Sequence, residues 1–127
     1  MTHSHTLRVP LPPDRALHLF TPVGERAWAP GWDPVFPAGE AGDGAAPGTV
    51  FLTGASTWVV VDREPDRVRY ARVTPGVRAG TIEVRLRADG AETLADVTYV
   101  TTALNDEPFD PEIAHWEPAI RAALAGS

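Results

Sequence analysis

The sequence predicts an α+β protein: an antiparallel sheet of about six strands, two short helices after the first strand and a C-terminal helix packed across the sheet. The first observation is the stretch 80–102 (GTIEVRLRADGAETLADVTYVTT), in which Ile82, Val84 and Leu86 alternate with charged residues. The second is the turn at Ala88-Asp89-Gly90, because Asp-Gly between alternating runs favours a tight hairpin. The third is an apolar stripe at helical spacing near the C-terminus, which could cover the hairpin.

Length and composition indicate one domain, residues 1–127, with a single core. The net charge of -6 argues against a nucleic acid or an anionic membrane as a partner, because both select basic surfaces. No apolar run is long enough to span a membrane, and the N-terminus lacks the features of a secretion signal, so we expect a cytoplasmic protein. The chain has no cysteine, which excludes disulfides and thiolate metal sites.

The N-terminal part predicts a strand at residues 4–9 that ends at three prolines. A short helix is expected at 14–20, where the acidic Asp14 suits the first turn. Thr21 and Pro22 then favour the start of a second short helix that runs to about Trp28.

Residues 29–48 are rich in proline and glycine and have no periodicity, so we expect a long loop whose first part is ordered by Trp32 and Phe36. Strands rich in β-branched residues follow, separated by turns at 64–66 and at Pro75-Gly76. They are expected at 49–53, 57–63 and 67–73, ahead of the hairpin.

The last element is expected to be a helix that begins at Asp110-Pro111-Glu112, which supplies a cap, a first-turn proline and an acid. Its apolar stripe consists of Ile113, Trp116, Ile120, Ala123 and Leu124. Pro118 lies within the stripe, so we expect it to bend the helix or to split it into two pieces.

The segment LPPDRALHLFTPVGERAWAPGWDP at 11–34 resembles the N-terminal part of bacterial START-like (SRPBCC) proteins, as does TWVVVDREPDRVRY at 57–70. This superfamily includes the Bet v 1 allergen fold, lipid-transfer domains and polyketide cyclases. The resemblance implies a helix-grip fold, in which the sheet curls around the C-terminal helix and encloses an apolar cavity. The chain departs from the pattern in its short final helix with Pro118.

The candidate ligand-binding residues are mostly aromatic, because small-molecule pockets favour aromatic walls with a few polar groups. They are Trp28, Trp32, Phe36, Thr53, Trp58, Tyr70, Arg72, Tyr99, Thr101 and Trp116. For each aromatic residue the alternative is plain core packing. Arg72 shares a strand face with Val68 and Tyr70, so it either pairs with a ligand carboxylate or phosphate or, as we favour, reaches solvent at the strand end.

Catalytic and metal-binding groups are sparse in the sequence. His18 and His115 are expected at surfaces rather than as general bases, and His3 with His5 lacks a third ligand for a metal site. We therefore name no catalytic residue, no metal and no cofactor.

The leading interpretation is a protein that binds a lipid, a polyketide or an aromatic molecule in the cavity. One alternative is a polyketide cyclase or aromatase that uses the same cavity, which a pocket-facing histidine or carboxylate with a shifted pKa would favour. A second alternative is an interaction protein like the Hsp90-activator relatives of this fold, which an exposed apolar patch would favour. Whether a reaction is catalysed, which ligand binds and the oligomeric state, with a homodimer among the options, stay open.

Overall fold

The computed structural model describes residues 1–126 and confirms the predicted α+β fold. Among these residues, no helix is both long enough and apolar enough to cross a membrane. The elements in chain order are β1 (Thr2–Val9), α1 (Pro13–Ala16), η1 (Leu17–Phe20), η2 (Gly24–Ala27), β2 (Val50–Thr53), β3 (Ser56–Glu64), β4 (Arg67–Thr74), β5 (Arg78–Asp89), β6 (Glu92–Ala103), η3 (Ile113–His115) and α2 (Trp116–Ala125), where η denotes a 3-10 helix.

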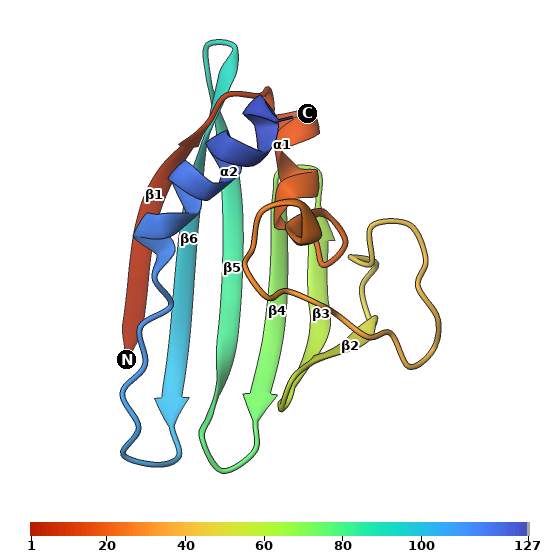
Figure 1. Cartoon of the computed structure of the whole chain (residues 1–127), viewed down its shortest axis with the longest axis vertical. Helices are drawn as coiled ribbons and strands as arrows, with labels where there is room; N and C mark the ends of the chain where they lie inside the picture. The colour runs from red at the N-terminus through yellow and green to blue at the C-terminus, as the bar shows by residue number, and fades with distance from the viewer. Residues whose placement is uncertain (127) are drawn as a thin grey trace.

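The six strands form one antiparallel sheet in the order β1-β6-β5-β4-β3-β2. Its longest pairing is the predicted hairpin of β5 and β6, where Ile82 lies opposite Tyr99 and Val84 opposite Val97, all four buried. The turn lies one residue further along than expected, at residues 90–91, and Gly90 has the positive φ of 65° that the turn requires. Figure 1 shows α2 crossing in front of β1, β6 and β5, with the short helices in front of β4 and β3.

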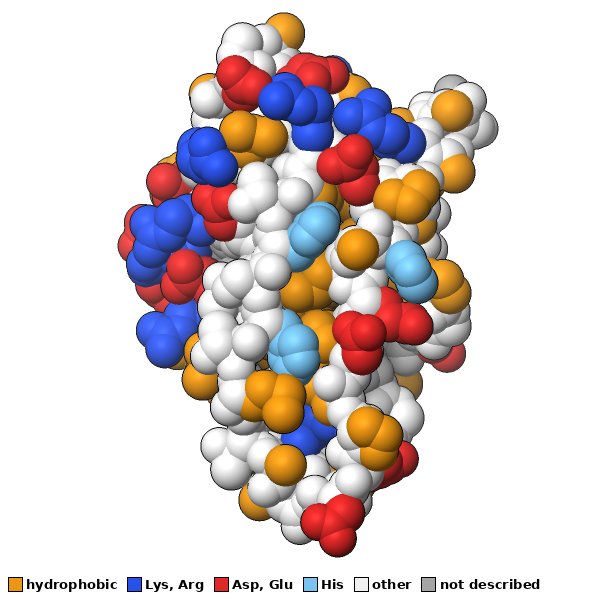
Figure 2. Space-filling view, turned by 90° about the vertical axis from the view of Figure 1, so that its left-hand side faces the viewer, with side chains coloured by type: hydrophobic (Ala, Val, Ile, Leu, Met, Phe, Trp, Pro, Cys, Tyr) orange, Lys and Arg blue, Asp and Glu red, His pale blue; other side chains and the backbone are white. Residues whose placement is uncertain are grey.

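The outer face of the sheet is charged and solvated. Figure 2 shows acidic and basic side chains intermixed on this face, with hydrophobic side chains in the seam between the sheet and the C-terminal segment. Ion pairs join neighbouring strands there, for example Arg87 to Asp96 at 3.0 Å. The apolar residues of β5 and β6 therefore point to the other face, towards the helices.

The two one-turn helices η1 and η2 pack against each other without space for a side chain between them. The Thr21 hydroxyl donates to the carbonyl of His18 (2.7 Å) and accepts from the N–H of Gly24 (3.0 Å). The N-cap of η2 is Val23, however, because the helix begins two residues later than the predicted start at Pro22. A Cβ atom on Gly24 would lie 1.7 Å from the His18 carbonyl oxygen, so only glycine fits.

The expectation that the final helix begins at Asp110-Pro111-Glu112 is wrong. This segment is irregular, with Glu112 in the left-handed region at a φ of 54°, and a single 3-10 turn (η3) precedes α2. Pro118 explains the difference, because it lies in the first turn of α2, where a missing N–H costs no hydrogen bond. The chain thus splits into two helical pieces before the proline rather than at it. Ile120 is fully buried, so α2 docks by the expected stripe.

Candidate functional site

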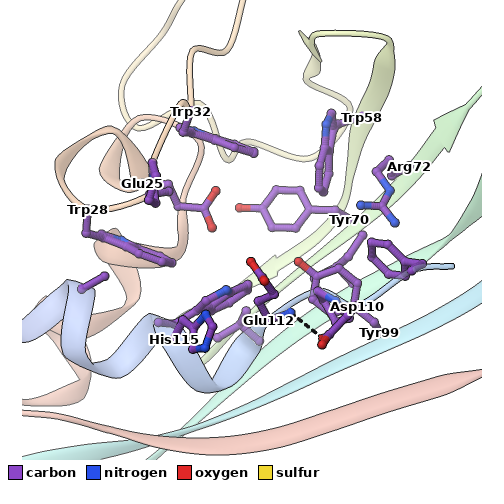
Figure 3. Close-up of a pocket in the computed structure, with 18 of the residues that line it drawn as sticks. Glu25, Trp28, Trp32, Trp58, Tyr70, Arg72, Tyr99, Asp110, Glu112 and His115 are labelled. Carbon is purple, nitrogen blue, oxygen red and sulfur yellow. Dashed lines mark hydrogen bonds between the residues drawn. The ribbon is translucent and has the colours of Figure 1, made fainter.

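A pocket of about 440 Å³ lies between the inner face of the sheet and the C-terminal segment (Figure 3). Its lining residues come from η2 and the loop that follows it, from the sheet, and from the C-terminal segment with α2. The lining residues are Glu25, Trp28, Ala29, Pro30, Trp32, Phe51, Trp58, Tyr70, Arg72, Ile82, Val84, Tyr99, Phe109, Asp110, Pro111, Glu112, His115, Trp116 and Ala119.

Eight of the nineteen residues that line the pocket are Trp, Tyr or Phe, and their rings contact one another. The rings of Trp28 and Trp116 lie 5.3 Å apart, and those of Trp32 and Trp58 lie 5.6 Å apart. Phe51 stacks on Trp58 with an angle of 9° between the ring planes. The rings thus form two groups, one around Trp28 and Trp116 and one around Trp32 and Trp58, and the Arg72 guanidinium lies over a ring of each.

Hydrogen bonds hold these rings in fixed orientations. The indole N–H groups of Trp28 and Trp32 donate to backbone carbonyls at 2.7 and 2.8 Å, and that of Trp58 donates to the hydroxyl of Thr53 at 2.8 Å. The Tyr70 hydroxyl donates to a backbone carbonyl at 2.7 Å. Because the polar ends of the rings are satisfied by the protein, their apolar faces are what the pocket offers.

Glu25 is the pocket residue that the sequence analysis missed. It leaves η2 with its carboxyl group pointing into the pocket, towards the Tyr70 hydroxyl (Figure 3). Within residues 1–126 nothing donates a hydrogen bond to this carboxyl, and burial raises its pKa well above the ordinary value of 4.5. Burial also raises the pKa of Tyr70 and Tyr99, and the nearby Glu25 adds to both shifts.

Arg72 faces the pocket, so the expectation that it reaches solvent is wrong. Its guanidinium lies over the rings of Trp58, Tyr99 and Phe109, at 5.2, 5.7 and 5.1 Å from their centroids. Its Nε and Nη2 atoms are buried and have no hydrogen-bond partner in the described part of the chain. Burial lowers the pKa of Arg72, the nearby Tyr99 opposes this change, and the nearby Arg78 adds to it.

The structure brings seven of the ten candidate ligand-binding residues to this pocket: Trp28, Trp32, Trp58, Tyr70, Arg72, Tyr99 and Trp116. The other three lie elsewhere. Phe36 packs on Phe51 with the ring centroids 5.8 Å apart, and Thr53 accepts the hydrogen bond from Trp58. Thr101 lines a second, smaller pocket.

The histidines take peripheral places. His18 is exposed, as expected, and lies outside the pocket. His115 is also exposed but lies at the edge of the pocket, beside Trp116. In the part of the chain that the structure describes, no group of three or more histidine and acidic side chains is arranged to hold a metal ion.

No protein-family model matches this chain, and no curated protein matches it in sequence. Solved structures do match, over nearly its whole length. CalU16 from Micromonospora echinospora is 19% identical with a TM-score of 0.64, over 98% of this chain and 70% of CalU16. Ara h 8.0201 is 14% identical with a TM-score of 0.60, over 100% of both chains. DynU16, described as a protein of the dynemicin biosynthetic locus, is 18% identical with a TM-score of 0.61, over 98% of this chain and 46% of DynU16.

Proposed function

We propose that this protein, which has the helix-grip fold of START-like proteins, binds a hydrophobic small molecule with aromatic rings in the pocket between the sheet and α2. The pocket itself carries the proposal. Its volume of about 440 Å³ falls in the usual range for small-molecule sites, roughly 300–1,000 Å³. The rings are already oriented by hydrogen bonds, so a ligand would meet a prearranged wall and would not have to order it.

The tryptophans provide a direct assay, because all four of them line the pocket. We expect the neutral probe N-phenyl-1-naphthylamine to quench tryptophan fluorescence saturably, as its own emission rises. Ala119→Phe should weaken this binding at least tenfold by filling the pocket from α2. Ala122→Phe is the matched control, because Ala122 is exposed on the same helix. Absence of saturable binding to the wild type, or equal binding by the two variants, would contradict the proposal.

The alternative of a cyclase or aromatase gains one supporting observation, the pocket-facing carboxyl of Glu25. Because its pKa is raised, Glu25 would be protonated at a higher pH than an ordinary glutamate. In an aldol-type ring closure, the attacking α-carbon loses a proton to solvent and the carbonyl oxygen under attack takes one up, which a neutral carboxyl group can supply before it is reprotonated from solvent. The similarity to DynU16, a protein of a biosynthetic locus, agrees with this alternative.

The test of this second candidate is cyclisation of a synthetic poly-β-ketone by the wild type and by Glu25→Gln. We expect the variant to lose turnover but to bind N-phenyl-1-naphthylamine within about twofold of the wild type. Equal turnover by both proteins, or none by the wild type, would remove the cyclase candidate and leave the binding function standing.

The interaction-protein alternative also has one supporting observation. Apolar side chains are exposed on the outer face of β2 to β4, where Val50, Leu52 and Val73 are 42%, 36% and 39% exposed. If this face mediates self-association, light scattering should show a multimer that Val73→Glu dissociates. A monomeric wild type at high concentration would leave this face without that role.

A further inference from the structure

One end of the pocket contains Phe109, whose ring lies close to two arginines. The guanidinium carbons of Arg72 and Arg78 are 5.1 and 4.3 Å from the centroid of its ring. Phe109 lines both the main pocket and a neighbouring pocket of about 240 Å³, which Arg78 and Thr101 also line. Both guanidinium groups therefore lie close to one ring, Arg72 in the main pocket and Arg78 in the neighbouring one.

Arg72 and Arg78 differ from the other nine arginines. Seven of those form ion pairs with carboxylates: Arg8, Arg26, Arg63, Arg67, Arg85, Arg87 and Arg121. Arg15 and Arg69 are exposed to solvent. In the described structure, Arg72 and Arg78 are thus the arginines that are partly buried and have no carboxylate within ion-pair distance. A partly buried cation without a counter-ion is costly, and ring faces offset only part of that cost.

Other polar atoms around Phe109 are also unsatisfied. The Thr101 hydroxyl and Nδ1 of His3 are buried without a hydrogen-bond partner among residues 1–126, and the His3 ring packs edge-on against Phe109 at 5.9 Å. The acidic residues of the pocket do not compensate for these groups. Glu25 points into the pocket from the side opposite Arg72 (Figure 3), and an Asp110 carboxylate oxygen accepts a backbone N–H at 2.8 Å. The third acidic residue of the pocket, Glu112, forms no ion pair with Arg72 or Arg78 in the described structure.

We infer that Arg72 and Arg78 form an anion-binding subsite at the Phe109 end of the pocket, so the ligand is an aromatic molecule that carries an acidic oxygen group such as a carboxylate or sulfonate. The inference rests on the proposed function, because it names the chemistry of the molecule that the aromatic wall would hold. The acidic group supplies the missing counter-ion, and charge-assisted hydrogen bonds from a guanidinium are among the stronger polar contacts in proteins. The net charge of the chain is -6, so affinity for an anion must come from a local cluster of this kind.

Two probes with the same ring skeleton separate the subsite from the pocket. 8-Anilino-1-naphthalenesulfonate carries an anionic group, and N-phenyl-1-naphthylamine lacks it. We expect Arg72→Met to weaken binding of the sulfonate roughly tenfold or more and to change binding of the neutral probe less than about threefold. Arg78→Met should act in the same direction. Arg72→Lys keeps the charge but not the planar guanidinium, so it should lose less sulfonate affinity than Arg72→Met does. Arg69→Met is the control, because Arg69 is exposed on the same strand and its removal changes the net charge equally.

The results distinguish an anion-binding subsite from a pocket that binds hydrophobic molecules without regard to charge. A selective loss of sulfonate binding in Arg72→Met or Arg78→Met, but not in Arg69→Met, supports the subsite. Equal losses for both probes in both pocket variants, or equal effects of all three Met substitutions on the sulfonate, overturn it while the binding function stands. Failure of both probes to bind the wild type overturns the binding function as well.

Discussion

Glu25→Gln should stabilise the protein, by an amount that grows with pH. The Glu25 carboxyl lies in the pocket without a hydrogen-bond donor among residues 1–126, and burial raises its pKa well above 4.5. The folded protein therefore holds this proton more tightly than the unfolded chain does. As the pH rises past the unfolded-state pKa, unfolding releases a proton, and the free energy of unfolding falls. Glutamine has nearly the same shape and carries no charge, so the variant escapes this loss.

The slope of this effect follows from proton linkage. Between the unfolded-state pKa and the folded-state pKa of Glu25, the wild type loses up to about 1.4 kcal/mol of stability per pH unit relative to Glu25→Gln. Above the folded-state pKa the difference becomes constant. At roughly 4 °C of melting temperature per kcal/mol, a stability difference of about 1 kcal/mol between the two proteins is readily measured.

The assay is urea unfolding of both proteins at several pH values between about 4 and 8. Glu64→Gln serves as the control, because Glu64 is exposed at the end of β3 and forms no ion pair in the described structure. We expect the wild type and Glu25→Gln to be similar near pH 4 and to diverge as the pH rises, with the variant more stable. Parallel curves, or a wild type that is more stable than the variant at pH 8, would refute the claim that the half-buried Glu25 carboxyl has no partner in the pocket.

Two further substitutions test the packing of the pocket and of α2. Trp32→Ala should weaken binding of N-phenyl-1-naphthylamine about tenfold. It should destabilise the fold less than Phe51→Ala does, because Trp32 is half-buried and Phe51 is 1% exposed. Equal losses of stability would make Trp32 a core residue. Ile120→Asp should abolish cooperative thermal unfolding, because it places a charge at the fully buried position of α2, between the helix and the sheet. A melting curve like that of the wild type would mean that α2 does not dock on the sheet.

The sheet was predictable because its pattern is local. The alternation of Ile82, Val84 and Leu86 sets the buried face of β5, and all three are buried. The same alternation from Tyr70 indicated that Arg72 shares the inner face. The start of α2 was predicted wrongly. Asp110 is a good capping residue and favoured an early start, but Pro118 fits best in the first turn of a helix, and α2 accordingly begins at Trp116.

The rest of the site depends on contacts between distant segments. Glu25 lies in a single 3-10 turn, which is too short for a periodic pattern to show which way its side chain points. Phe109 reaches Arg72 and Arg78 from an irregular segment that follows the last strand, and no local pattern indicates that contact. Thr53 was a sensible choice by residue type, but it orients Trp58 and does not line the pocket.

The most direct test of the pocket is a titration of ¹⁵N-labelled protein with N-phenyl-1-naphthylamine, followed through the indole N–H signals. All four tryptophans line the pocket, and the amides of Gly76 and Gly90 lie in exposed turns outside it. The account predicts saturable shifts of the indole signals while the Gly76 and Gly90 amides stay in place. Indole signals that do not move, with or without shifts elsewhere, would contradict it.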